Sequence, residues 1–73
     1  MNLREARLSR GESQQELATA VRVSISTIQK FEQGRREMSD KLKIKIADHL
    51  GYTVGYIFFG DEITESNRKE VSQ

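Results

Sequence analysis

Apolar residues recur along this chain at the spacing that places them on one side of a helix. Within residues 13–36 they form two short groups, one around Leu17 and one around Ile28, with a brief polar interval between them. Ser13 and Glu16 have the spacing of a capping box, in which an N-cap oxygen and an acid three residues later each accept a bond from the other's backbone amide. This stretch therefore predicts two short helices joined by a tight turn.

Three more helices are predicted around this pair. The first spans residues 2–10 and begins with Asn2 as its cap. The second spans residues 39–50, with Ser39 as its cap and an apolar stripe, and the third spans residues 54–58, between Thr53 as its cap and a glycine. Two neighbouring helices with one apolar stripe each must bury those stripes on a third element. We therefore expect an all-α domain of five helices over residues 1–60, with a flexible acidic tail over residues 61–73.

The predicted helix that follows Ser24 has one polar face. This face carries small hydroxyl groups, an amide and a cation, on Ser24, Ser26, Thr27, Gln29 and Lys30. Such groups make hydrogen bonds with the edges of base pairs in a major groove. An ordinary solvent-exposed helix can have the same composition, so the face alone leaves both interpretations open.

Residues on both sides of the predicted turn match a known pattern. They are Ser13-Gln14, Glu16-Leu17-Ala18, Val23-Ser24, Ile28, Phe31-Glu32 and Gly34-Arg35-Arg36, with Arg7, Gly11, Ile46-Ala47, Leu50 and Phe58 outside this stretch. Across residues 2–60 the chain closely resembles the helix-turn-helix proteins of the phage repressor/Cro family, also called the Xre family. The resemblance implies a five-helix lambda-repressor-like fold, with the second and third helices as the helix-turn-helix, and a transcription regulator that binds double-stranded DNA.

The resemblance also implies which residues contact DNA. They are Gln14, Ser24, Ile25, Ser26, Thr27, Gln29, Lys30, Arg35 and Arg36. In chemical terms Lys30 suits the O6 and N7 atoms of guanine, Ser26 suits either base-pair edge, and an exposed Ile25 suits a thymine methyl group. Thr27 and Gln29 are expected near the flank of the helix, where phosphate contact is equally favoured.

Three of these residues are expected at the DNA backbone. Gln14 lies in the first turn of its helix, where backbone amides also favour a phosphate. Arg35 and Arg36 follow the glycine that ends the recognition helix, and each cation that neutralises a phosphate steepens the salt dependence of binding. Two cations at this position also suit the negative end of the helix, which is compatible with either role.

The family pattern gives a structural role to one ion pair and shows two departures. Arg7 and Glu32 are expected to bond across the domain and thereby to join the first helix to the end of the third. Glu12 stands where a large apolar residue is usual. Arg22 stands where a glycine is usual, because the turn there tends to positive φ, so Arg22 is expected to carry mild strain of about 1 kcal/mol.

Charge is distributed unevenly although the net charge is only +1. Residues 1–36 hold seven basic groups against four acids, and residues 61–73 hold two against four. A basic half that bears the recognition helix fits a DNA-binding protein, although ordinary solvated surface gives the same count. Lys41, Lys43 and Lys45 alternate along a predicted helix and are interpreted mainly as solubilising residues rather than one patch.

The composition argues against several classes of protein. The chain has no cysteine and a single histidine, His49, so disulfides, a thiolate metal site and a histidine-based catalytic triad are not expected. No acids, base and nucleophile converge in the sequence, and we expect neither an enzyme nor a cofactor. No apolar run approaches the roughly 20 residues of a membrane span, so a soluble cytoplasmic protein without membrane contact is expected.

Aromatic residues gather near the end of the predicted domain, at Tyr52, Tyr56, Phe58 and Phe59. A domain this small cannot bury them all, and a two-fold dimer contact through Tyr56, Phe58 and Phe59 is the economical explanation. We therefore expect a homodimeric repressor that binds an inverted-repeat operator. By family resemblance, small proteins of this kind are common in phages, mobile elements and restriction–modification or toxin–antitoxin operons. The alternative is a protein-interaction module, such as an antitoxin or adaptor, that sequesters a partner protein through the same segment.

Overall fold

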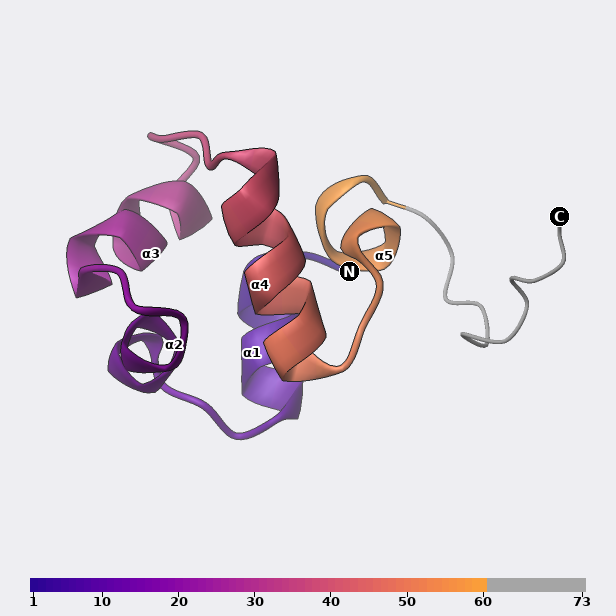
Figure 1. The fold of residues 1–73 in the computed structure, drawn as a ribbon, viewed down its shortest axis with the longest axis horizontal. Helices are drawn as coiled ribbons and strands as arrows, with labels where there is room; N and C mark the ends of the chain where they lie inside the picture. The colour runs from indigo at the N-terminus through magenta and orange to yellow at the C-terminus, as the bar shows by residue number, and fades with distance from the viewer. Residues whose placement is uncertain (61–73) are drawn as a thin grey trace, which may run out of the picture.

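The computed structural model describes residues 1–60, which form five α-helices (Figure 1). The helices are α1 (Leu3–Ser9), α2 (Gln14–Val21), α3 (Ile25–Glu32), α4 (Asp40–Leu50) and α5 (Val54–Phe58). No strand occurs within this range, so the predicted all-α fold of five helices is confirmed. The tail predicted over residues 61–73 lies outside the described residues.

Each helix begins after a residue whose side-chain oxygen accepts a bond from an amide in the first turn. These capping residues are Asn2, Ser13, Ser24, Ser39 and Thr53. At α2, Ser13 Oγ accepts from the Glu16 amide at 3.0 Å, and Glu16 Oε1 accepts from the Ser13 amide at 2.8 Å. The caps satisfy amides that have no partner inside the helix, and for helices this short they fix the starting residue.

The apolar stripes of the helices meet in one core. Its buried members are Leu3, Ala6, Leu17, Ala18, Val21, Ile28, Met38, Ile46, Ala47, Leu50 and Ile57. Helix α2 packs against α3 and α4, while α5 packs against α4 and α1. In Figure 1, α2 and α3 lie on one side of α4, and α5 lies on the other side. The side of α3 remote from the core is therefore left to solvent.

The turn between α2 and α3 has the left-handed backbone that the family resemblance implies. Arg22 has φ 64° and ψ 47°, and among the described residues it is the one non-glycine with positive φ. Its amide donates to the carbonyls of Ala18 and Thr19, which closes the end of α2. Lys45 Nζ also donates to the Val21 carbonyl at 3.1 Å. The turn is thus closed on both sides, although a side chain in this conformation carries strain.

Glu12, the second departure from the family pattern, makes a polar contact in place of apolar packing. Its Oε2 lies 2.7 Å from His49 Nε2 near the end of α4. Its backbone carbonyl accepts a bond from Arg7 Nη1 at 2.7 Å. Glu12 therefore joins the loop after α1 to both α1 and α4.

Candidate nucleic-acid interface

The orientation of α3 separates its residues into a buried and an outward side. Ile28 is fully buried, and Phe31 packs against the core with its ring edge-to-face on Phe58 at 5.6 Å between centroids. At 100° per residue, Ser26 and Gln29 point the other way, and both are partly exposed. Lys30 lies on the flank of this outward side and is exposed. The outward side of α3 thus presents a hydroxyl, an amide and a cation.

Two predicted contact residues at the start of α3 differ from expectation. Thr27 was expected near the exposed flank, but it is only 9% exposed, and its Oγ1 lies 3.1 Å from Ser24 Oγ. Thr27 thus lies beside the cap residue rather than on an exposed flank, and its role as a DNA contact stays a prediction. Ile25 was expected to be exposed, but it is half-buried and packs against the core. Ser24 itself is exposed, while its Oγ accepts from the Thr27 amide at 3.3 Å.

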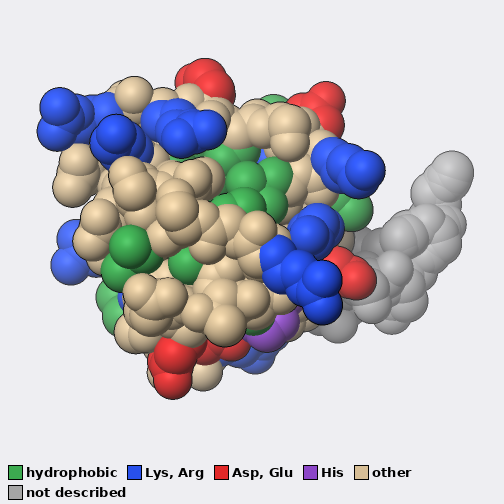
Figure 2. All heavy atoms as spheres, turned by 60° about the vertical axis from the view of Figure 1, so that its left-hand side comes forward, with side chains coloured by type: hydrophobic (Ala, Val, Ile, Leu, Met, Phe, Trp, Pro, Cys, Tyr) green, Lys and Arg blue, Asp and Glu red, His purple; other side chains and the backbone are tan. Residues whose placement is uncertain are grey.

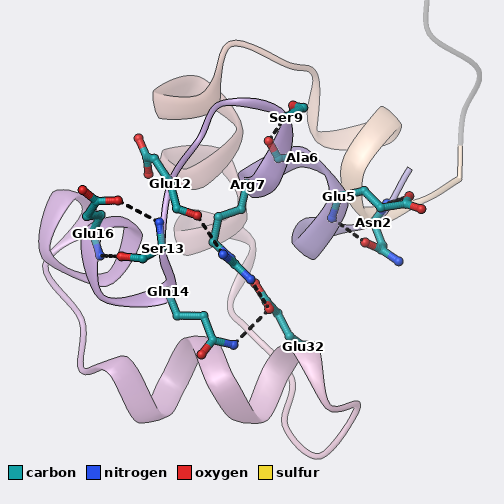
Figure 3. A network of polar contacts seen from close by, with 10 residues as sticks. All are labelled: Asn2, Glu5, Ala6, Arg7, Ser9, Glu12, Ser13, Gln14, Glu16 and Glu32. Carbon is teal, nitrogen blue, oxygen red and sulfur yellow. Dashed lines mark hydrogen bonds and ion pairs between the residues drawn. The ribbon is translucent and has the colours of Figure 1, made fainter.

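The predicted ion pair holds the far end of α3. Arg7 Nε and Nη2 donate to the two carboxylate oxygens of Glu32 at 2.9 and 3.1 Å, and the side chains are 7% and 5% exposed (Figure 3). Arg7 lies on α1 and Glu32 is the last residue of α3. Such a bidentate pair fixes orientation as well as distance. The pair therefore fixes the end of α3 against α1.

Gln14 takes part in the same network. Its Nε2 donates to Glu32 Oε1 at 3.1 Å, and Figure 3 shows its side chain extending from the start of α2 towards α3. The sequence predicts that Gln14 contacts a phosphate, whereas the structure shows a bond within the protein. A carboxamide has a second N–H and a carbonyl oxygen, so the two roles are compatible. The bond also places the start of α2 beside the last turn of α3.

Basic residues surround α3 at both ends. Arg35 and Arg36 are exposed just after α3, where Gly34 has φ 76° and the Arg35 amide donates to the Lys30 carbonyl at 2.8 Å. Arg22 lies just before α3. Figure 2 shows Lys and Arg side chains along the upper edge and again at the right of one face, with hydrophobic side chains between them. This arrangement favours a polyanion over a neutral ligand.

Sequence analysis missed one group of cations. Arg22, Lys41 and Lys45 line the same hollow between the helix-turn-helix and α4. The spacing of Lys41 and Lys45 by four residues on one helix was the available signal. Arg22 is distant in sequence, and packing alone brings it to the same place.

The three residues predicted at a dimer contact have different environments. Tyr56 is half-buried and packs on Tyr52 with 5.4 Å between ring centroids, and Phe58 is half-buried against Phe31. Phe59 is 63% exposed, and Lys43 Nζ lies 5.1 Å from the centre of its ring. Among these three, Phe59 therefore offers the most uncovered apolar surface.

Within residues 1–60, no three His, Cys, Asp or Glu residues come together as metal ligands would. None of the described helices is long and apolar enough to cross a membrane.

A family model and a solved structure match the chain. The helix-turn-helix family model HTH_3 matches residues 3–57. Among solved structures, the crystal structure of the clp gene regulator ClgR from Corynebacterium glutamicum is similar, with a TM-score of 0.73 and 35% sequence identity. That match covers 78% of this chain and 61% of the ClgR chain. The comparison with curated proteins found no match.

Proposed function

We propose that this chain, which belongs to the helix-turn-helix family HTH_3, represses transcription by binding a specific double-stranded DNA site. The observation that carries the proposal is the outward side of α3, where Ser26, Gln29 and Lys30 lie opposite the buried residues. An α-helix fits the width of a major groove, where these groups read base edges. That ClgR is a gene regulator supports the same role.

Base contacts and phosphate contacts come from different parts of this surface. Lys30 is the strongest candidate for base reading, because an ammonium group bonds well to guanine O6 and N7. Arg35, Arg36 and the start of α2 at Gln14 provide the phosphate contacts that set position and most of the affinity. The bonds that Glu32 accepts from Arg7 and Gln14 hold α3 at a fixed angle while it reads the groove.

Two copies of the chain are proposed to bind one operator. The exposed ring of Phe59 at the end of α5 gives each copy an apolar contact, and a two-fold axis there makes the contact identical on both copies. Two recognition helices related in this way read half-sites about one DNA turn apart, roughly 34 Å. The operator is therefore an inverted repeat, and repression follows from occupying a promoter.

The test is selection of duplexes from a random library by the purified chain. The native chain is expected to enrich an inverted repeat and to sediment as a dimer. Lys30→Ala should relax the preference at one base pair of each half-site, at a cost of about 1–3 kcal/mol. Arg4→Ala removes an exposed cation from α1 and is the charge-matched control, which should keep the preference. Failure of the native chain to enrich any sequence would refute sequence-specific binding.

A second candidate function is capture of a partner protein, as by an antitoxin or adaptor. The observation that favours it is the exposure of large apolar side chains, 63% for Phe59 and 58% for Ile44. The two functions respond differently to Lys30→Ala. A partner complex should survive Lys30→Ala and be lost with Phe59→Ala, whereas sequence-specific DNA binding should be weakened by Lys30→Ala even where the dimer remains intact.

A further inference from the structure

A hollow of about 260 Å³ lies between the α2–α3 turn and the N-terminal half of α4. Its lining consists of Val21, Arg22, Val23, Ser39, Lys41, Leu42 and Lys45. The three apolar residues are buried or half-buried, while the cations are exposed. The hollow thus combines an apolar base with a basic rim, and no acid is among its lining residues.

The three cations of this rim have no acidic partner among residues 1–60. Within residues 1–60 the ion pairs are Arg7–Glu32 and Glu12–His49, so none of the three cations is neutralised by an acid there. The backbone of Arg22 is fixed by the end of α2, and Lys45 Nζ is held at the hollow by its bond to the Val21 carbonyl. Positive charge is therefore positioned at the hollow before any ligand arrives.

Lys43, on the same helix, behaves differently. Its Nζ lies 5.7 Å from the centre of the Phe58 ring and 5.1 Å from that of Phe59. The alternating lysines of α4 therefore serve two faces, with Lys41 and Lys45 on one and Lys43 on the other. This separation agrees with the expectation that the three lysines do not form one patch, and it supplies an internal control.

The size and place of the hollow indicate what it binds. Sites that enclose a whole drug-sized ligand occupy roughly 300–1,000 Å³, so this smaller hollow suits one part of a larger molecule. Its residue Val23 immediately precedes Ser24, the cap of α3, so the hollow lies at the N-terminal end of the proposed recognition helix. When α3 occupies a major groove about 12 Å wide, a phosphate backbone borders it on either side.

We infer that Arg22, Lys41 and Lys45 bind a phosphate group of the DNA backbone that flanks the groove. The cations neutralise the phosphate, and the apolar base packs against the carbon-bound hydrogens of the adjoining deoxyribose. Arg35 and Arg36, after α3, contact phosphates beyond its other end. This inference rests on the proposed function, because it places the phosphate relative to DNA that α3 has already engaged.

The test measures DNA affinity against salt concentration for the selected operator. Lys41→Gln removes a charge that makes no hydrogen bond to residues 1–60, and Arg22→Asn removes another while keeping a residue that tolerates positive φ. One phosphate contact is lost from each of the two copies proposed to bind the operator. Each substitution is therefore expected to weaken binding roughly ten- to hundredfold at 100 mM salt and to reduce the magnitude of the log–log salt slope by roughly 1.8. Lys43→Gln is the control on the same helix and should leave the slope unchanged.

The outcomes separate this inference from the proposed function. Native protein that binds no operator overturns both. If the native protein binds the operator but Lys41→Gln and Arg22→Asn bind it no differently from Lys43→Gln, the inference alone is overturned. An acidic protein surface then becomes the better candidate for the hollow. Thermal unfolding of each variant identifies any loss that comes from misfolding.

A second measurement distinguishes backbone phosphate from a free anion. Inorganic phosphate is titrated into the native chain while backbone amide shifts around the hollow are followed by NMR. Weak, unsaturated shifts with inorganic phosphate, together with strong shifts at the same amides with operator DNA, support the inference. If inorganic phosphate saturates these amide shifts tightly and does not compete with operator DNA, the inference is overturned in favour of a free-anion site.

Discussion

Replacing Arg7 is expected to destabilise the domain more than replacing Arg7 and Glu32 together. Arg7→Met leaves the Glu32 carboxylate buried without its cation, and it also leaves the Glu12 carbonyl without its donor. A second change, Glu32→Gln, removes the stranded charge and keeps an amide that fits beside Gln14. The double variant should therefore be more stable than Arg7→Met alone, which is an effect that independent contributions do not produce.

The burial of the pair sets the magnitude. Side chains that are 7% and 5% exposed belong to the class in which loss of one partner costs about 3–5 kcal/mol. Glu32→Gln keeps one acceptor oxygen, so it should lower the free energy of unfolding by about 3 kcal/mol. Arg7→Met should lower it by about 5 kcal/mol. A chain of this size has a total stability of only about 4–11 kcal/mol, so each single variant should lose a large share of it. The melting temperature should fall by about 4–8 °C for each kcal/mol lost.

The assay is urea and thermal unfolding of the native chain, both single variants and the double variant. Arg4→Met changes an exposed arginine on the same helix and should stay within about 0.5 kcal/mol of the native chain. The double variant is expected to lose at least about 3 kcal/mol less than the sum of the single losses, because it should be more stable than Arg7→Met alone. Additive losses, or a double variant less stable than Arg7→Met, would refute the argument that the stranded charge is the costly state.

Three further outcomes are expected. Arg22→Gly relieves the positive-φ strain, so the melting temperature should stay the same or rise by an amount equivalent to about 1 kcal/mol, while a clear fall would contradict the strain. Ser13→Ala removes the α2 cap and should cost about 1 kcal/mol in urea unfolding, unlike Thr19→Ala on the exposed side of the same helix. Phe59→Ala removes a mostly exposed ring, so it should shift sedimentation from dimer to monomer with little change in unfolding at matched low concentration; an unchanged dimer would place the contact elsewhere.

The sequence was sufficient to predict the helices and the turn, because local chemistry decides both. Each expected cap residue accepts a bond from the first turn of its helix. The positive φ at Arg22 was predictable only through the family resemblance, because the family usually has a glycine at this position. The Arg7–Glu32 pair could be predicted only through the family resemblance, since their sequence separation carries no local signal.

Side-chain partners across the domain were less predictable. Thr27 is polar and lies on the buried side of α3, and a hydrophobic pattern cannot show a polar residue that is buried with its hydroxyl beside Ser24. Gln14 bonds to Glu32, which is distant in sequence and reaches it only because α2 crosses α3. Likewise, the packing of α4 on the turn brings Arg22 to Lys41. These placements depend on tertiary packing, which residue spacing does not determine.

The same bonds stabilise the domain and orient the proposed recognition surface. Helix α3 has eight residues and is too short to be stable alone, so its position is set by the packing of Ile28 and Phe31 and by contacts at its two ends. The Ser24–Thr27 cap holds the first end, and the carboxylate of Glu32, bonded to Arg7 and Gln14, holds the second. The outward residues between these ends need no partner within the protein, and they can therefore vary with the DNA sequence without loss of the fold. On this reasoning the stability of the domain and its choice of DNA site are set by different residues of one short helix.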